Sequence, residues 1–110
     1  MNLSIKALDN FVKDIKGLSK KYKNIKSDLK SLQKELLENP KNGISLGNNC
    51  YKIRVANSSI PTGKRAGFRV IYYYFDQKGV IYLMTIYSKN DMENLSDEKI
   101  LEILKDNDLG

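Results

Sequence analysis

Five side chains between positions 52 and 89 are suited to chemistry on a phosphate group. Lys52 and Arg54 lie two positions apart, and Arg69, Tyr87 and Lys89 follow within two long apolar segments. Arg contacts phosphate at two points and keeps its charge, while Lys and Tyr transfer protons when neighbouring cations lower their pKa from about 10. Such residues can cleave RNA through attack of the ribose 2′-hydroxyl on the adjacent phosphate. The residues alone leave this open, because tyrosines at strand spacing are more often core residues than catalytic ones.

Composition excludes several classes of site. The chain has 110 residues, no His and a single Cys, Cys50. The lack of His excludes Ser-His triads and His-ligated metals, and one Cys excludes a disulfide framework or a cysteine zinc site. Asp76 is the only acid among residues 40–90, so a carboxylate metal site is not expected there. The sequence therefore predicts no metal and no cofactor.

The net charge of +6 is unevenly distributed. Residues 40–90 hold eight Lys or Arg against one acid, whereas residues 91–110 hold two Lys against seven acids. All three Arg lie between positions 54 and 69, and the Lys64–Arg65 pair falls in a polar loop. This pattern indicates a polyanion-binding face, with Lys52, Lys64 and Arg65 as candidate RNA-phosphate contacts. The alternative is a solvated basic surface, which is the usual explanation of lysine-rich helices.

Length and hydropathy indicate one small domain spanning residues 1–110. No apolar run approaches the roughly 18 residues that a membrane span needs. The N-terminus lacks the continuous apolar stretch of a signal peptide. We expect a soluble, cytoplasmic protein.

The first part of the chain predicts a short edge strand within residues 1–7 and then two helices. Asp9 is expected to cap the first helix, whose apolar face is Phe11, Ile15, Leu18 and Tyr22. Asn24 is expected to cap the second, whose apolar stripe is Ile25, Leu29, Leu32, Leu36 and Leu37. Pro40 disfavours helical geometry at Asn39 and ends this helical hairpin.

From Gly43 the apolar period changes to two residues, which is typical of strands. Residues 44–46 form a weak strand, and residues 51–55 alternate so that Lys52 and Arg54 share one face. Residues 67–76 and 80–89 form two long strands, joined by a type I turn closed by Gly79 in the left-handed region.

The turn predicts which residues face each other across these two strands. A three-residue loop opposes Asp76 and Val80, and therefore Arg69 and Tyr87, so that Arg69, Tyr87 and Lys89 share one face. The other face is expected to be the core beneath the helical hairpin, with Phe68, Val70, Tyr72, Tyr74, Val80, Tyr82, Met84 and Ile86. A slip of one residue in register would reverse both faces.

The chain ends with a predicted short helix. Ser96 is its expected cap, and Ile100, Leu101, Ile103 and Leu104 are its apolar residues. The predicted fold class is α+β, with the helical hairpin packed on a mainly antiparallel twisted sheet of three to four strands.

Three segments together resemble the RelE/ParE superfamily of bacterial toxins. They are Tyr51-Lys-Ile-Arg54, the Gly63–Tyr72 segment with its Gly-Lys-Arg loop and Phe-Arg strand, and Ile81–Lys89. The Gly-Lys-Arg loop points to the HigB-like branch. The resemblance extends from about Phe11 to Leu104 and implies a RelE/ParE-like fold.

The resemblance implies the toxin of a type II toxin–antitoxin system. Such a toxin is a metal-independent endoribonuclease, an mRNA interferase that enters the A site of the 70S ribosome and cleaves mRNA. A cognate antitoxin of helix-turn-helix type would neutralise it, and the complex would bind operator DNA through the antitoxin.

The resemblance also implies roles for individual residues. Lys52 and Arg54 match a basic pair that acts on the phosphate and as base, and Arg69 matches a transition-state stabiliser. Lys89 falls where related nucleases carry an arginine that acts as acid or stabilises the leaving group. A tyrosine found near the C-terminus of a well-known relative is missing from residues 93–95, so either Tyr87 replaces it or the cations act alone.

Two other functions remain open at this stage. The ParE branch of the same fold inhibits DNA gyrase without cleaving a phosphodiester. A non-catalytic RNA-binding or ribosome-binding module would use exposed tyrosines to stack bases.

Overall fold

The computed structural model describes residues 2–61, 66–92 and 94–110. The elements follow in the order β1 (Ser4–Ala7), α1 (Asp9–Leu18), α2 (Ile25–Glu38), β2 (Ile44–Gly47), β3 (Cys50–Val55), β4 (Phe68–Phe75), β5 (Val80–Ser88) and α3 (Asp97–Asp106). None of the helices in these ranges has the length and apolar character that crossing a membrane requires.

The five strands form one sheet in the order β1-β5-β4-β3-β2. β1 runs parallel to β5, and all other neighbours are antiparallel. The predicted α+β class is confirmed, but the sheet has five strands rather than three to four, and its β1 edge is parallel. β2 and β3 are joined by Asn48 and Asn49, whose φ angles of 52° and 61° suit a tight two-residue hairpin loop.

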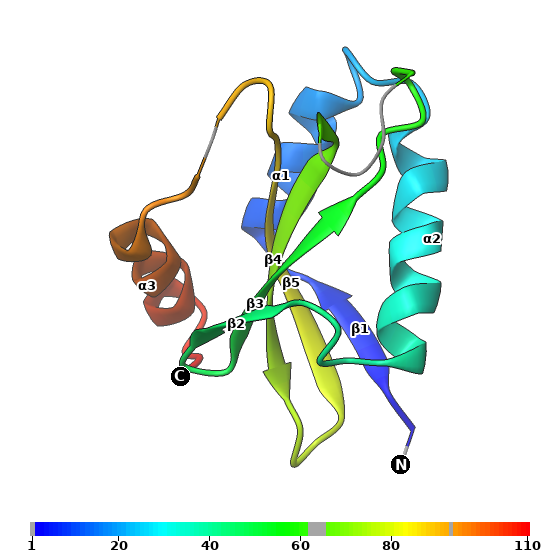
Figure 1. Ribbon diagram of the computed structural model, residues 1–110. Coiled ribbons are helices and arrows are strands. Elements are labelled where there is room, and N and C mark those ends of the chain that lie inside the picture. Colours follow the sequence, from blue (N-terminus) through cyan, green and yellow to red (C-terminus); the bar gives the residue numbers. More distant parts are fainter. Residues whose placement is uncertain (1, 62–65, 93) are drawn as a thin grey trace.

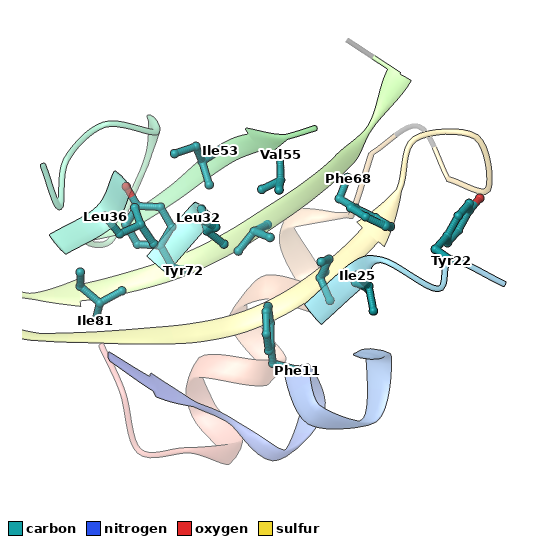
Figure 2. Close-up of a cluster of buried hydrophobic side chains, with 12 residues drawn as sticks. Phe11, Tyr22, Ile25, Leu32, Leu36, Ile53, Val55, Phe68, Tyr72 and Ile81 are labelled. Carbon is teal, nitrogen blue, oxygen red and sulfur yellow. The ribbon is translucent and has the colours of Figure 1, made fainter. Parts of the chain in front are cut away.

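Helices cover both faces of the sheet. α1 and α2 lie on one face, and α3 lies on the other (Figure 1). The core under α1 and α2 joins helix residues such as Phe11 and Leu36 to strand residues such as Phe68 and Tyr72 (Figure 2). The core under α3 consists of Cys50, Ile71, Tyr73, Met84, Tyr87, Ile100, Ile103 and Leu104. The molecule is therefore a three-layer sandwich in which α3 covers only part of its face.

The pairing of β4 and β5 differs from the expected register at the turn. Phe75, not Asp76, lies opposite Val80, so the loop has four residues, although Gly79 does adopt the expected positive φ of 64°. A β-bulge between Ile71 and Tyr72 then shifts the register by one residue. The longer loop and the bulge offset each other, so Arg69 lies opposite Tyr87 as predicted.

Because of the bulge, part of the predicted core is wrong. Phe68, Val70, Tyr72 and Ile86 are buried under α1 and α2 as expected. Tyr82 and Met84 instead belong to the core under α3, and Val80 shares that face through its pairing with Phe75. Ile81 and Leu83 take their places under the helical hairpin, because an extra residue in a strand reverses the alternation beyond it.

Polar side chains of α1 satisfy the backbone beside the bulge. Asp14 Oδ2 accepts hydrogen bonds from Thr85 Oγ1 at 2.7 Å and from the backbone N–H of Ile86 at 3.2 Å. Asn10 Nδ2 donates to the Met84 carbonyl at 3.1 Å. Because a bulge disrupts the regular ladder, these bonds replace pairing that the strands do not provide.

The structure differs from the prediction in one helix cap and in the burial of two leucines. Leu8, not Asp9, occupies the cap position of α1, and Asn24 caps α2 by position but makes no capping side-chain bond. Ser96 does cap α3, since its Oγ accepts the Lys99 N–H at 3.2 Å. Leu37 and Leu101 were expected to be apolar-face residues, but both are exposed.

We predict that Asp14→Ala lowers the free energy of unfolding by about 1–3 kcal/mol, because it leaves the Thr85 hydroxyl and the Ile86 N–H beside the bulge without their acceptor. Urea unfolding measures the change. Asp9→Ala, at the exposed start of the same helix, should cost no more than about 1 kcal/mol. Equal losses for the two variants would contradict the assigned role of Asp14.

Candidate functional site

A pocket of about 190 Å³ opens where α3 leaves the sheet uncovered. Four cations surround it, two from β3, one from β4 and one from the residue that follows β5. Its lining residues are Ile44, Lys52, Arg54, Arg69, Lys89 and Asn94. We call it the cationic pocket. The structure thus brings together Lys52, Arg54, Arg69 and Lys89, which the sequence predicted as site residues.

Arg54 and Arg69 lie directly opposite each other on β3 and β4. Like charges at opposed positions of a sheet are destabilising. Arg69 is 4% exposed, and its Nη1 donates to the Phe68 carbonyl at 3.1 Å. Burial lowers the pKa of Arg69, the charge of Arg54 lowers it further, and Tyr87 acts in the opposite direction. An anion placed between the two guanidinium groups would relieve this repulsion.

Backbone contacts position Lys89, and a side-chain hydrogen bond positions Lys52. The Lys89 N–H donates to the Gly67 carbonyl at 3.1 Å, which continues the β4–β5 pairing as predicted. A Cβ on Gly67 would overlap the Val55 carbonyl oxygen, so only Gly lets the chain approach β3 so closely at this point. Lys52 Nζ donates to Asn94 Oδ1 at 3.1 Å, which joins β3 to the segment after β5.

Tyr87 lies beside the cationic pocket rather than in its lining. It lines an adjoining cavity of about 230 Å³, and its side chain is 6% exposed. Burial raises the pKa of Tyr87, while the backbone at Leu95 and the charge of Arg69 lower it by less. Among the described residues no group forms a hydrogen bond with this hydroxyl. The hydroxyl is thus held in its neutral form against Arg69, enclosed by protein.

Sequence reasoning missed two lining residues. Ile44 and Asn94 reach the pocket from a short edge strand and from the connection between β5 and α3. Neither has a local sequence signal, because only the tertiary path of the chain places them there. Lys64 and Arg65, also predicted as phosphate contacts, lie outside the described residues.

The arrangement is suited to holding a phosphate. Within residues 2–61, 66–92 and 94–110 no group of three or more His, Cys, Asp or Glu has the placement of a metal site. The cationic pocket instead offers Arg forks and Lys ammonium groups, which bind phosphate oxygens directly. Burial of Arg69 strengthens its electrostatic effect on a bound anion.

No family model matches the chain. Its fold does match solved structures of the E. coli toxin RelE. The isolated RelE toxin matches with a TM-score of 0.58 and 21% identity, over 94% of this chain and 96% of RelE. A RelE mutant with two Arg-to-Ala substitutions, in the free state, gives 0.57 and 22%, over 84% and 90%. The chain has the RelE fold.

The E. coli RelBE toxin–antitoxin complex also contains this fold. It matches with a TM-score of 0.58 and 21% identity, over 78% of this chain and 95% of that chain. The RelE/ParE-like fold predicted from three sequence segments is therefore confirmed. These structures do not specify the HigB-like branch, which remains a prediction.

We predict that Arg54→Gln raises the free energy of unfolding of the ligand-free protein by roughly 0.2–1 kcal/mol, because it removes the repulsion across the strands from Arg69. Chemical denaturation at low salt measures the change.

Sulfate should stabilise the wild-type protein more than this variant, since an anion bound only to the folded state adds stability. If Arg54→Gln instead lowers stability without sulfate, repulsion between the two arginines is not the dominant interaction.

Proposed function

We propose that this protein is the toxin of a type II toxin–antitoxin system and acts as an endoribonuclease on mRNA in the ribosomal A site. One observation carries the proposal: Arg54, Arg69, Lys52 and Lys89 converge on one pocket within the RelE fold. A neutralising antitoxin is the expected partner, and the RelBE complex, with the same fold, supports it.

The proposed reaction uses the RNA's own 2′-hydroxyl as nucleophile. Its oxygen forms a bond to the adjacent phosphorus while the bond from phosphorus to the 5′-oxygen breaks. The 2′-proton goes to a base on the enzyme, and another proton goes to the 5′-oxygen. The products are a 2′,3′-cyclic phosphate and a 5′-hydroxyl.

Each pocket residue has a role in this proposal. Arg54 and Arg69 neutralise the charge that develops on the phosphate oxygens, an effect worth roughly 3–4 kcal/mol per donor. Lys52 takes the 2′-proton, and Lys89 gives a proton to the leaving oxygen. The ribosome supplies the alignment of the RNA, which a small open pocket does not provide by itself.

Tyr87 has a different role from the one first expected. Because its hydroxyl is enclosed and its pKa is raised, we assign it to positioning Arg69, not to proton transfer. The proton steps in the proposal therefore rely on cations alone, the second of the two alternatives left by the missing C-terminal tyrosine.

The ParE-like alternative predicts a different phenotype. A gyrase inhibitor performs no phosphodiester chemistry and needs no cluster of cations around one phosphate. The cationic pocket therefore favours the nuclease. Translation arrest with mRNA ends inside codons would support the nuclease, and DNA damage with intact mRNA would support gyrase inhibition.

We predict that Arg69→Ala lowers mRNA cleavage on programmed ribosomes by about 100- to 1,000-fold, because it removes the buried donor to the phosphate. Growth arrest on induction should be lost too. Arg69→Lys should recover only part of the activity, since Lys keeps the charge but not the fork. Tyr87→Phe should lose less than Arg69→Ala.

Lys78→Ala is the control for the loss of one positive charge away from the pocket. Lys78 lies in the turn between β4 and β5, with Nζ 5.8 Å from the Phe75 ring centre, and does not line the cationic pocket. It should leave cleavage unchanged. Circular dichroism and antitoxin affinity should be the same for all variants, and an Arg69→Ala protein that still cleaves mRNA would refute the site.

We further predict that ribosome affinity weakens by about tenfold or more between roughly 50 and 200 mM salt, because each phosphate contact releases counterions. A binding titration at several salt concentrations measures the slope. Arg54→Gln should reduce the slope of log affinity against log salt concentration by the contribution of about one phosphate contact. An affinity independent of salt would indicate an apolar docking surface instead.

A further inference from the structure

A second cavity of about 400 Å³ adjoins the cationic pocket. The two share three lining residues, Ile44, Lys52 and Arg54. The second cavity is completed by Glu35, Asn42, Gly43 and Ile53. We call it the loop cavity, because the connection between α2 and β2 forms one of its walls.

The sheet creates this cavity at its edge. Ile44 pairs with Lys52 at the start of β2, whereas β3 continues to Val55. Beyond Lys52, β2 therefore no longer covers the outer edge of β3. Figure 1 shows the loop that carries the chain from the end of α2 to this point. Arg54 lines both cavities, so a phosphate bound by Arg54 would lie at the boundary between them.

Buried contacts fix the walls of the loop cavity. The Tyr72 hydroxyl donates to the Pro40 carbonyl at 2.8 Å and accepts the Gly43 N–H at 3.1 Å. Burial raises the pKa of Tyr72 to about 12, so the hydroxyl stays neutral and keeps both hydrogen bonds. A Cβ on Gly43 would lie 2.9 Å from the Lys52 carbonyl oxygen, which shows how closely the loop packs on β3.

The polar groups of the loop cavity differ from those of the cationic pocket. Asn42 Nδ2 donates to Glu35 Oε1 at 2.8 Å, which ties the loop to α2. Glu35 makes a further interaction besides that with Asn42. A carboxylate repels phosphate but accepts up to about four hydrogen bonds in all, so Glu35 can also accept a donor from a ligand. Ile44 is 64% exposed and offers an apolar surface for a planar ring.

We propose that the loop cavity is a nucleobase subsite that selects a base carrying an exocyclic amino group, next to the phosphate bound in the cationic pocket. Adenine, cytosine and guanine present amino donors to a carboxylate, whereas uracil presents carbonyl acceptors on both sides of its one N–H. Glu35 accepts from the amino group, and Asn42 supplies the neighbouring amide. This inference rests on the proposed ribonuclease function.

The test compares cleavage-site profiles of the wild type, Glu35→Gln and Glu38→Gln on ribosomes programmed with mRNAs that differ at one base. Glu38 ends the same helix, is exposed and does not line the cavity. The wild type and Glu38→Gln should disfavour uracil at one position beside the cut by about five- to 100-fold. Glu35→Gln should reduce this preference to within about twofold while cleavage continues, since an amide both donates and accepts.

A second variant covers the case in which Glu35→Gln does not fold. Asn42→Ala should also weaken the preference, and thermal unfolding identifies any variant that has lost its structure. If the wild type cleaves and all folded variants keep its base preference, the subsite is refuted and the ribonuclease stands.

A binding measurement separates failure of the subsite from failure of the proposed function. Dinucleotides with a 2′-O-methyl group cannot be cleaved, and NMR titration reports their contact with the Asn42 and Gly43 amides. Shifts that are larger for amino-bearing bases than for uracil support the subsite even if the wild type never cleaves mRNA. Shifts that do not depend on the base overturn it.

Discussion

Two arginines that face each other across adjacent strands are the constraint on which the proposed site depends. Arg54 and Arg69 are directly opposed, Arg69 is buried, and the charge of Arg54 lowers the pKa of Arg69. Opposed like charges are unfavourable in a sheet by themselves, and a bound phosphate would offset that cost. This arrangement is what phosphate recognition requires, since donors placed in advance need no reorganisation when charge develops.

The register that places this pair rests on features far from the pocket. The four-residue turn and the bulge at Ile71 each shift the pairing of β4 and β5 by one residue, in opposite directions. Asp14 and Asn10 of α1 hold the backbone on the β5 side of the bulge. The helical hairpin therefore supports the site indirectly, by keeping Arg69 opposite Tyr87 while it covers the other face.

Much of the fold follows from the sequence because apolar periodicity and turn residues are local signals. The helices, the long strands and the left-handed Gly79 are of this kind. The bulge is not, because Leu83 and Met84 are both apolar and only packing against the helices decides which face of the sheet each one takes. The four cations were accessible to sequence reasoning through charge and alternation. Asn94, Ile44 and the loop cavity were not, since they depend on where the chain returns in space.

The central claim is that the cationic pocket promotes attack by the 2′-hydroxyl, and the chemistry of the RNA ends tests it most directly. Purified protein and programmed ribosomes would be incubated with an mRNA and with a copy carrying one 2′-deoxynucleotide at the cut. Mass spectrometry of the fragments should show a 2′,3′-cyclic phosphate and a 5′-hydroxyl, with no cleavage of the 2′-deoxy copy. Fragments with a 5′-phosphate and a 3′-hydroxyl, or cleavage of the 2′-deoxy copy at the same rate, would contradict the account.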